Sequence, residues 1–116
     1  MNPRDIRAYF FDVQKACGLI LQFTRGVTRE SFLVDLLLRS AVERQLEILG
    51  EAIRKPFELD PSLAQKIMDV RSISGFRDRL AYGYDRVDPA EVWDICQGDL
   101  SKLMEEMRIL IDEAAR

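Results

Sequence analysis

The sequence predicts an all-α protein, an up-and-down bundle of four to five helices that forms a single domain over residues 1–116. Apolar residues recur every three or four positions through several long runs, which is the period of an amphipathic helix. No segment shows the alternation of apolar and polar residues that is typical of a half-buried strand. Proline or glycine beside a capping residue separates the runs and marks where each helix begins or ends.

The first helix is expected at residues 3–24. Asn2 is a good N-cap and Pro3 suits the first helical position, where a missing N–H costs nothing. Gly26 breaks the pattern that follows. The positions that recur at helical spacing are Ile6, Phe10, Val13, Cys17, Ile20 and Leu21.

The second helix is expected at residues 29–55, with Thr28 as its cap and Pro56 as its stop. Near its start, apolar side chains cover more than half a turn, which is wider than one packed face needs. They are Leu36, Leu37, Leu38, Ala41 and Val42. Two interpretations stay open: a surface for a dimer, or the central helix of the bundle buried on several sides.

Three further elements complete the predicted bundle. Asp60-Pro61 opens a shorter helix that runs through Leu63, Ile67 and Met68 until Ser72 to Gly75 interrupt it. A short helix is expected next, over the segment from Arg77 to Tyr84. The last helix should run from residue 89 to about 114, because Asp88 is a cap, Pro89 suits the first position and Glu91 is placed for a capping box.

Composition narrows the class of protein. Apolar residues make up 47% of the chain and charged residues 32%, which is ordinary for a folded helical domain and excludes a disordered one. No run approaches the roughly 18 apolar residues of a membrane span, and the start has no signal-peptide core, so we expect a cytoplasmic protein. Cys17 and Cys96 lie in apolar runs and are expected to be buried rather than paired.

The chain contains no histidine and no close cysteine pair. A zinc or iron site built on nitrogen or sulfur ligands is therefore excluded, although carboxylates are able to hold magnesium. We expect chemistry that needs neither metal nor cofactor. The net charge is −3, yet residues 71–86 carry four arginines against two aspartates, a local charge of +2. A small cluster of positive charge on an otherwise acidic protein is more typical of a phosphate site than of a long nucleic-acid groove.

Arg77, Asp78, Tyr82 and Tyr84 form the candidate site within this cationic segment. Arg77 and Tyr84 are seven residues apart, so a helix would place them on one face about 10 Å apart along its axis. Position 82 joins them only where Gly83 ends or distorts the helix. A plainer interpretation is a solvated helix face with the two tyrosines packed at its end.

This spacing resembles the R-x-x-x-x-H-x-Y signature of the HEPN ribonuclease superfamily, and in particular its HepT-like toxins, with Tyr82 at the histidine position. The segment at residues 40–52 is similar to the second-helix signature of the same family. Tyr84-Asp85 and Val87-Asp88 also follow as they do there. The resemblance covers most of the chain and implies an HEPN-like helical bundle.

The resemblance also implies a function. HepT-like proteins are metal-independent endoribonucleases that act as toxins and form dimers whose two motifs face a shared cleft. Arg77 would bind the scissile phosphate, Asp78 would orient Arg77, and a histidine at position 82 would be the general acid or base. The implied partners are RNA, with tRNA first, and an MNT-type nucleotidyltransferase antitoxin that transfers AMP to Tyr84.

Tyr82 changes what is expected of this particular chain. A phenol with a pKa of about 10 stays protonated near neutral pH, and a lost acid–base group costs about 10² to 10⁴ in rate. Cleavage should therefore be feeble or absent, whether Tyr82 is a substitution or belongs to a natural inactive member. The alternative function is a non-catalytic helical module that pairs with a nucleotidyltransferase. A helical nucleotide-binding domain ranks last, because no glycine-rich phosphate loop accompanies the arginines.

Glu43, Glu47 and Glu51 are spaced by four residues and form an acidic row along the second predicted helix. Paired carboxylates are able to perform acid–base chemistry. Because neither a metal nor a partner group is indicated beside them, we interpret the row as a solvated or partner-facing surface.

Overall fold

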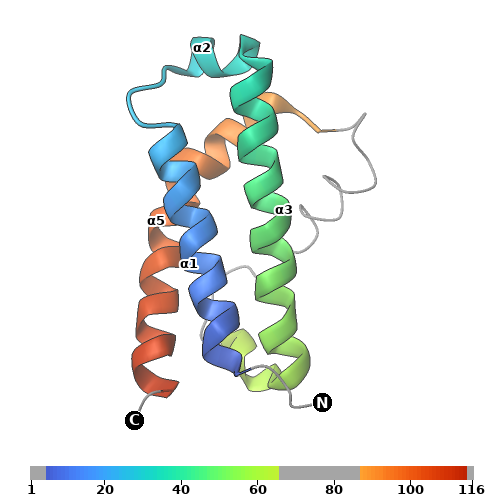
Figure 1. Cartoon of the computed structure of the whole chain (residues 1–116), viewed down its shortest axis with the longest axis vertical. Coiled ribbons are helices and arrows are strands. Elements are labelled where there is room, and N and C mark those ends of the chain that lie inside the picture. The colour runs from blue at the N-terminus through green and yellow to red at the C-terminus, as the bar shows by residue number, and fades with distance from the viewer. Residues whose placement is uncertain (1–4, 66–86, 115–116) are drawn as a thin grey trace.

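The structure, a computed structural model, describes residues 5–65 and 87–114 (Figure 1). These residues form four α-helices and one 3-10 helix, with no strand among them, so the predicted all-α class is confirmed. The elements in chain order are α1 (Ile6–Phe23), α2 (Arg29–Val34), α3 (Leu36–Leu59), the 3-10 helix η1 (Pro61–Gln65) and α5 (Pro89–Ala114).

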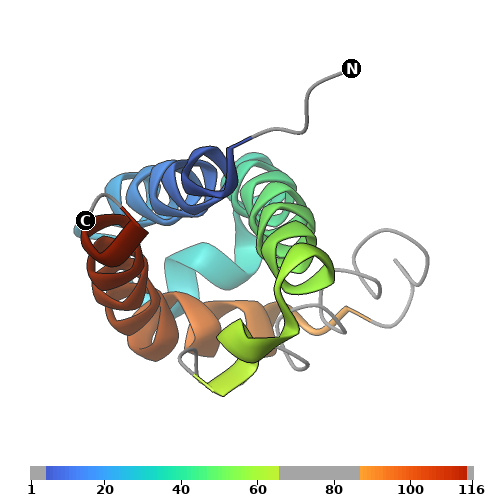
Figure 2. The same ribbon diagram turned by 90° about the horizontal axis from the view of Figure 1, so that it is seen from below.

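Three long helices build the body of the bundle. α1 packs against both α3 and α5, and it runs in the direction opposite to theirs (Figure 1). The short α2 contacts α3 and α5, and Figure 2 shows it lying across the end of the space between the long helices. No helix within residues 5–65 and 87–114 is both long and apolar enough to cross a membrane.

The first helix begins three residues later than predicted. Asp5 is its N-cap, because the Asp5 carboxylate accepts a hydrogen bond from the backbone N–H of Arg7 at 2.9 Å. At the other end the buried Thr24 hydroxyl donates to the carbonyl oxygen of Ile20 at 2.9 Å. Gly26 follows with φ of 74°, a left-handed conformation that suits glycine, so the predicted break there is confirmed.

The prediction of one helix over residues 29–55 is wrong at two points. Asp35 divides it into α2 and α3, serving as the C-cap of the first and the N-cap of the second. The Asp35 carboxylate accepts a hydrogen bond from the N–H of Leu38 at 3.0 Å, which satisfies a donor that a continuous helix would have used otherwise. Thr28 caps α2 as predicted, accepting from the N–H of Ser31 at 3.1 Å.

Pro56 does not stop α3, which continues to Leu59. The proline is buried, so packing of its ring offsets the hydrogen bond that its missing N–H removes. Arg54 pairs with Glu51 at 2.6 Å and also with Glu58, so its ion pairs span the proline turn on the exposed side. Asp60 ends the helix, and its N–H donates to the carbonyl of Pro56 at 2.8 Å.

The remaining elements begin where the sequence placed them. Asp60 accepts hydrogen bonds from the N–H and the hydroxyl of Ser62 at the start of η1, whose bounds are shorter than the predicted helix. The part of that prediction beyond Gln65 lies outside the described residues. Asp88 caps α5, accepting from the N–H of Ala90 at 2.9 Å, and α5 ends at Ala114 as expected.

One face of each long helix contributes side chains to the hydrophobic core. Cys17 and Cys96 are buried in it and unpaired, as predicted. Burial raises the pKa of both thiols to about 12, because a thiolate is poorly solvated there. The largest wholly buried side chains include Phe10, Val13 and Ile20 of α1, Phe32 of α2, Val42 and Ile53 of α3, and Val92 and Met107 of α5.

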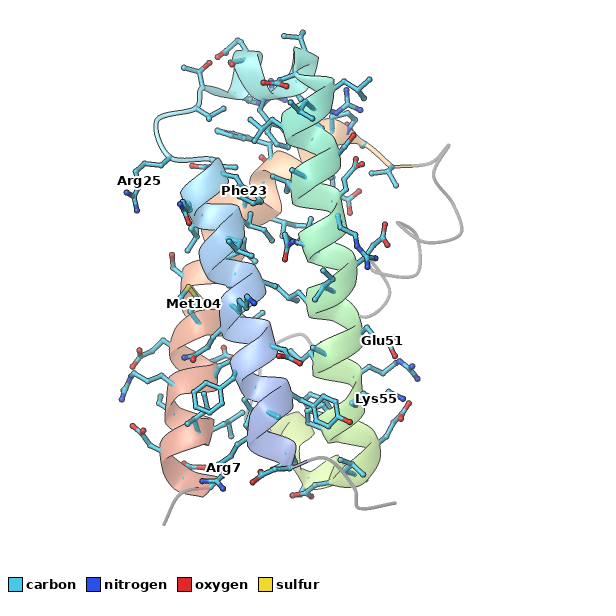
Figure 3. All side chains as sticks on the ribbon, viewed as in Figure 1. Arg7, Phe23, Arg25, Glu51, Lys55 and Met104 are labelled. Carbon is cyan, nitrogen blue, oxygen red and sulfur yellow. The ribbon has the colours of Figure 1, made fainter. Side chains whose placement is uncertain are left out.

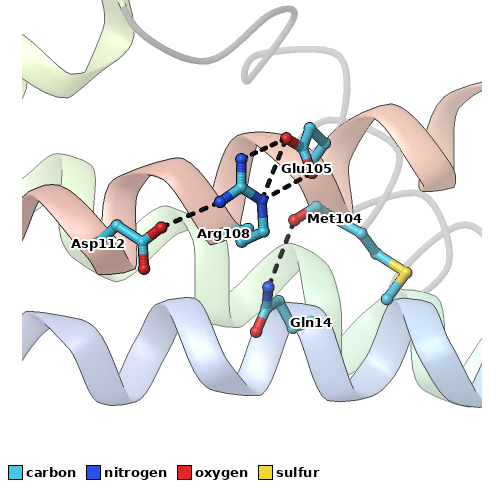
Figure 4. Close-up of polar contacts among 5 residues, drawn as sticks. All are labelled: Gln14, Met104, Glu105, Arg108 and Asp112. Atoms are coloured by element: carbon cyan, nitrogen blue, oxygen red, sulfur yellow. Dashed lines mark hydrogen bonds and ion pairs between the residues drawn. The ribbon is translucent and has the colours of Figure 1, made fainter.

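A polar contact joins α1 to α5 within the described residues. The Gln14 side-chain amide donates to the carbonyl oxygen of Met104 at 3.4 Å (Figure 4). On the exposed face of α5, Arg108 pairs with Glu105 at 2.6 Å and with Asp112 at 3.0 Å. Such exposed pairs contribute little to stability, because solvent screens them.

Candidate functional site

The four predicted site residues, Arg77, Asp78, Tyr82 and Tyr84, lie outside the residues that the structure describes. The structure does place the elements on either side of them. η1 contacts α3 near its end, whereas α5 begins close to α2 at the opposite end of the bundle (Figure 1). The second segment on which the family resemblance rests, residues 40–52, lies within α3.

Within residues 40–52, one face of α3 is buried and the other carries the acidic row. Val42, Leu46 and Leu49 are buried in the core. Glu43, Glu47 and Glu51 are each partly exposed and follow one another at four-residue spacing beside that buried face. This arrangement follows from the helical period, because side chains four residues apart share a face.

A shallow groove of about 330 Å³ runs between α1 and α3. Two of the three acidic-row residues, Glu47 and Glu51, line it, and Figure 3 shows Glu51 and Lys55 on the same stretch of α3. The full lining is Tyr9, Asp12, Arg44, Glu47, Ile48, Glu51, Ala52 and Lys55.

Two ion pairs lie along the α3 side of this groove. Arg44 donates to Glu47 at 3.3 Å, and Arg54 donates to Glu51 at 2.6 Å. Both arginine side chains are well exposed, at 68% and 43%, so solvent screens the two pairs and each adds little to stability. Their effect is to orient the carboxylates along the helix.

The charge of the groove does not suit RNA phosphate. Its lining contributes three carboxylates, Asp12, Glu47 and Glu51, against two cations, Arg44 and Lys55. A surface with excess negative charge repels a polyanion.

Burial affects Glu43, the first residue of the acidic row. Burial raises the pKa of Glu43 above its ordinary value, nearby Arg39 opposes the shift, and the Glu47 charge adds to it. Glu43 does not line the groove. Its position beside Arg39 makes it part of the joint between α2 and α3, because an Arg39 N–H donates to the carbonyl of Leu33 at 3.3 Å.

Metal ligands do not gather anywhere in the described ranges, where no group of three or more histidine, cysteine, aspartate or glutamate side chains could hold an ion. Tyr9, Asp12 and Lys55 were not singled out from the sequence. The signal for them exists in α1, where Tyr9 and Asp12 are spaced by three residues and partly exposed, next to the buried Phe10 and Val13. Only the packing of α1 on α3 brings them into the same groove as Lys55.

Comparison with known proteins also covers residues that the structure does not describe. A family model described as "Ribonuclease HepT-like" matches residues 13–110 of this chain. The match therefore extends across the segment from Arg77 to Tyr84.

Individual relatives agree with the family match. "Probable ribonuclease HepT" of Thermococcus cleftensis is 34% identical over 86% of this chain and 90% of its own length. Two proteins of Methanocaldococcus jannaschii named "Putative RNase" are 28% and 29% identical, covering 97% and 95% of this chain and 93% and 100% of their own lengths. No solved structure matches the chain significantly.

Proposed function

Because the chain belongs to the HepT-like ribonuclease family, we propose that it is the toxin of a toxin–antitoxin pair and a metal-independent endoribonuclease in its histidine-bearing form. The observation that carries this proposal is the family match over residues 13–110, which spans the arginine and tyrosine of the motif. The substrate is RNA, with tRNA as the first candidate, and the site of action is the cytoplasm.

The proposed chemistry is attack of a ribose 2′-hydroxyl on the adjacent phosphate. Arg77 binds that phosphate and stabilises the negative charge that develops on it, and Asp78 orients the guanidinium. A histidine at position 82 takes the hydroxyl proton or protonates the leaving 5′-oxygen. The bond from phosphorus to the 5′-oxygen breaks, which leaves a 2′,3′-cyclic phosphate on one product and a 5′-hydroxyl on the other.

RNA cleavage by the native chain is impaired, because Tyr82 occupies the histidine position of the motif. The phenol holds its proton near neutral pH and so is a poor base. Analysis of the product ends tests the chemistry: the Tyr82→His variant, in buffer with EDTA, should leave 2′,3′-cyclic phosphates on cleaved tRNA. Cleavage that stops when EDTA is added, or that leaves 3′-hydroxyl ends, would overturn the proposed mechanism.

The proposed regulation is covalent. A nucleotidyltransferase antitoxin transfers AMP from ATP to the Tyr84 hydroxyl and releases pyrophosphate, and the added negative charge competes with RNA phosphate for Arg77. Incubation with a partner enzyme and ATP should add one AMP to the chain, as intact-mass spectrometry measures. Tyr84→Phe should abolish this gain, while Tyr82→Phe should leave it unchanged. Labelling that persists in Tyr84→Phe would rule out Tyr84 as the acceptor.

A second function is favoured by one observation, the absence of any histidine from the chain. In this alternative, the protein is a non-catalytic module that binds a nucleotidyltransferase. It forms a stable complex with that enzyme, and the Tyr82→His variant gains no cleavage. Cleavage by the Tyr82→His variant therefore distinguishes the two functions.

A further inference from the structure

Of the α-helices that the structure describes, α2 is the least anchored. From residue 25 to residue 37, Phe32 has the one buried side chain. By contrast, α1 buries five of its residues and α3 buries seven. A segment with few buried apolar contacts opens at a lower free energy than the core does. We therefore expect α2 to detach more easily than α1 or α3.

The position of α2 leaves much apolar surface in water. Val34, at its end, exposes 83% of its surface, and Leu36 and Leu37 of the next turn expose 70% and 83%. These side chains gain little burial from the way α2 lies across the end of the bundle (Figure 2). The packing of α2 depends mainly on Phe32, with the partly buried Leu33 beside it. Moving α2 away therefore exposes little other apolar surface.

Both helices that flank α2 are closed off without its help. At the end of α1, the N–H of Thr24 donates to the Ile20 carbonyl at 3.0 Å. At the start of α3, the Asp35 carboxylate accepts from the N–H of Leu38 at 3.0 Å. Gly26 precedes α2 with a φ of 74°, and Asp35 follows it in an extended conformation. α2 is therefore able to move on these two joints while the hydrogen bonds of α1 and α3 persist.

An aromatic contact and a hydrogen bond attach α2 to its neighbours. The ring of Phe32 lies 5.3 Å from the ring of Trp93 on α5. An Arg39 N–H of α3 donates to the carbonyl oxygen of Leu33 at 3.3 Å, which is long for a hydrogen bond. Nε of the same guanidinium is buried and has no hydrogen-bond partner among the described residues, which costs free energy. Water that reaches this nitrogen when α2 leaves offsets part of that cost, so the hydrogen bond holds α2 weakly.

From these observations we propose that α2 is a strap that opens as a unit on Gly26 and Asp35 while α1, α3 and α5 stay packed. The closed strap hides Phe32 and packs on the ring of Trp93. Opening brings Phe32 into solvent beside the exposed apolar residues of the α2–α3 joint and uncovers the first turns of α5. The strap is a conformational switch that shows or hides this apolar surface. The inference goes beyond the proposed function, because it involves neither RNA nor residues 71–86.

Thiol labelling of Phe32→Cys tests the strap within one molecule. The introduced thiol becomes accessible when α2 opens, whereas the buried Cys17 of α1 reports unfolding of the bundle. An alkylating reagent should react with the introduced thiol at least about 10-fold faster than with Cys17. Guanidinium should accelerate the first reaction weakly and the second steeply, because the denaturant dependence scales with the surface that is exposed. Leu37→Cys gives the rate of an exposed thiol. Equal rates and equal denaturant dependence at the two buried positions would refute the strap.

Amide hydrogen exchange tests the native chain, where no substitution loosens α2. The Phe32 N–H donates to the Thr28 carbonyl at 3.0 Å and the Asp35 N–H donates to the Phe32 carbonyl at 3.3 Å, so both report on α2. The two amides should share one opening free energy, and they should exchange at least about 10-fold faster than the amides of Val42 and Leu46 in α3. Exchange of all four amides with one free energy and one denaturant slope would contradict the proposal. Fast α2 amides together with an introduced thiol no faster than Cys17 would mean that α2 frays without opening, which refutes it as well.

Discussion

The ring of Phe32 on α2 lies 5.3 Å from the ring of Trp93 on α5, with an angle of 42° between the ring planes. This pair joins the short helix that crosses the end of the bundle to the helix that follows residues 71–86. Because Phe32 has no exposed surface, the contact fixes the first turns of α5 against α2.

Removal of the Phe32 ring should be costly. Phe32→Ala should lower the free energy of unfolding by about 3–5 kcal/mol, because it leaves a cavity against Trp93. Denaturant unfolding followed by circular dichroism measures the loss. Trp93 is the one tryptophan of the chain, so its fluorescence reports the same contact directly. The control is Phe11→Ala at an exposed position, which should change stability by less than about 0.5 kcal/mol.

The double cap at Asp35 should contribute measurably. Asp35→Ala removes the acceptor for the Leu38 N–H and should lower stability by about 1 kcal/mol. Asp35→Asn retains a side-chain oxygen for the same N–H and should be close to native. Equal losses in the two variants, measured by denaturant unfolding, would show that the cap is not the source of the effect.

Replacement of Glu43 should stabilise the protein at neutral pH. Burial raises the Glu43 pKa, so the folded chain binds that proton more tightly than the unfolded chain. The resulting stability is present at low pH and is lost as the pH rises through the folded-state pKa. Glu43→Gln should therefore raise the melting temperature at pH 7 by about 1–3 °C. The gain should vanish below the ordinary value of 4.5, and a gain that is constant with pH would contradict this cause.

The two thiols should be protected by the fold. Burial raises the pKa of Cys17 and Cys96 to about 12, so little thiolate is present at pH 8. Ellman's reagent should react slowly with the native chain and rapidly with both thiols in guanidinium. A Leu37→Cys variant, used as the positive control, should gain one fast thiol without denaturant. Fast reaction of the native chain would mean that the core opens readily.

Most of the fold could be predicted from local signals. Asp88 and Pro89 gave the start of α5 correctly, because a cap followed by a proline acts within one turn. The break at Asp35 escaped prediction, since the apolar period runs through it and only the carboxylate contact with Leu38 reveals it. Pro56 was predicted to end the helix, whereas α3 continues past it. The ring of Pro56 is buried, and such burial depends on tertiary packing that the local sequence does not reveal.

The candidate site also has a part that the sequence predicts and a part that only the packing of the helices reveals. Arg77, Asp78, Tyr82 and Tyr84 came from spacing and family resemblance, and their roles stay predictions. The groove between α1 and α3 needs residues from two helices, so sequence period alone could not find it. The open question about the wide apolar start of α3 is answered for Leu36 and Leu37: they are exposed, so burial in a central helix does not account for them.

Cleavage of a total tRNA pool in EDTA is the decisive test of the ribonuclease, with the native chain compared with Tyr82→His and Tyr82→His/Arg77→Ala. We expect Tyr82→His to cleave at a rate about 10² to 10⁴ above that of the native chain, because the acid–base group is restored. Arg77→Ala should abolish that gain, because the phosphate loses its charged partner. Absence of cleavage by all three folded proteins would contradict the ribonuclease and favour the binding module.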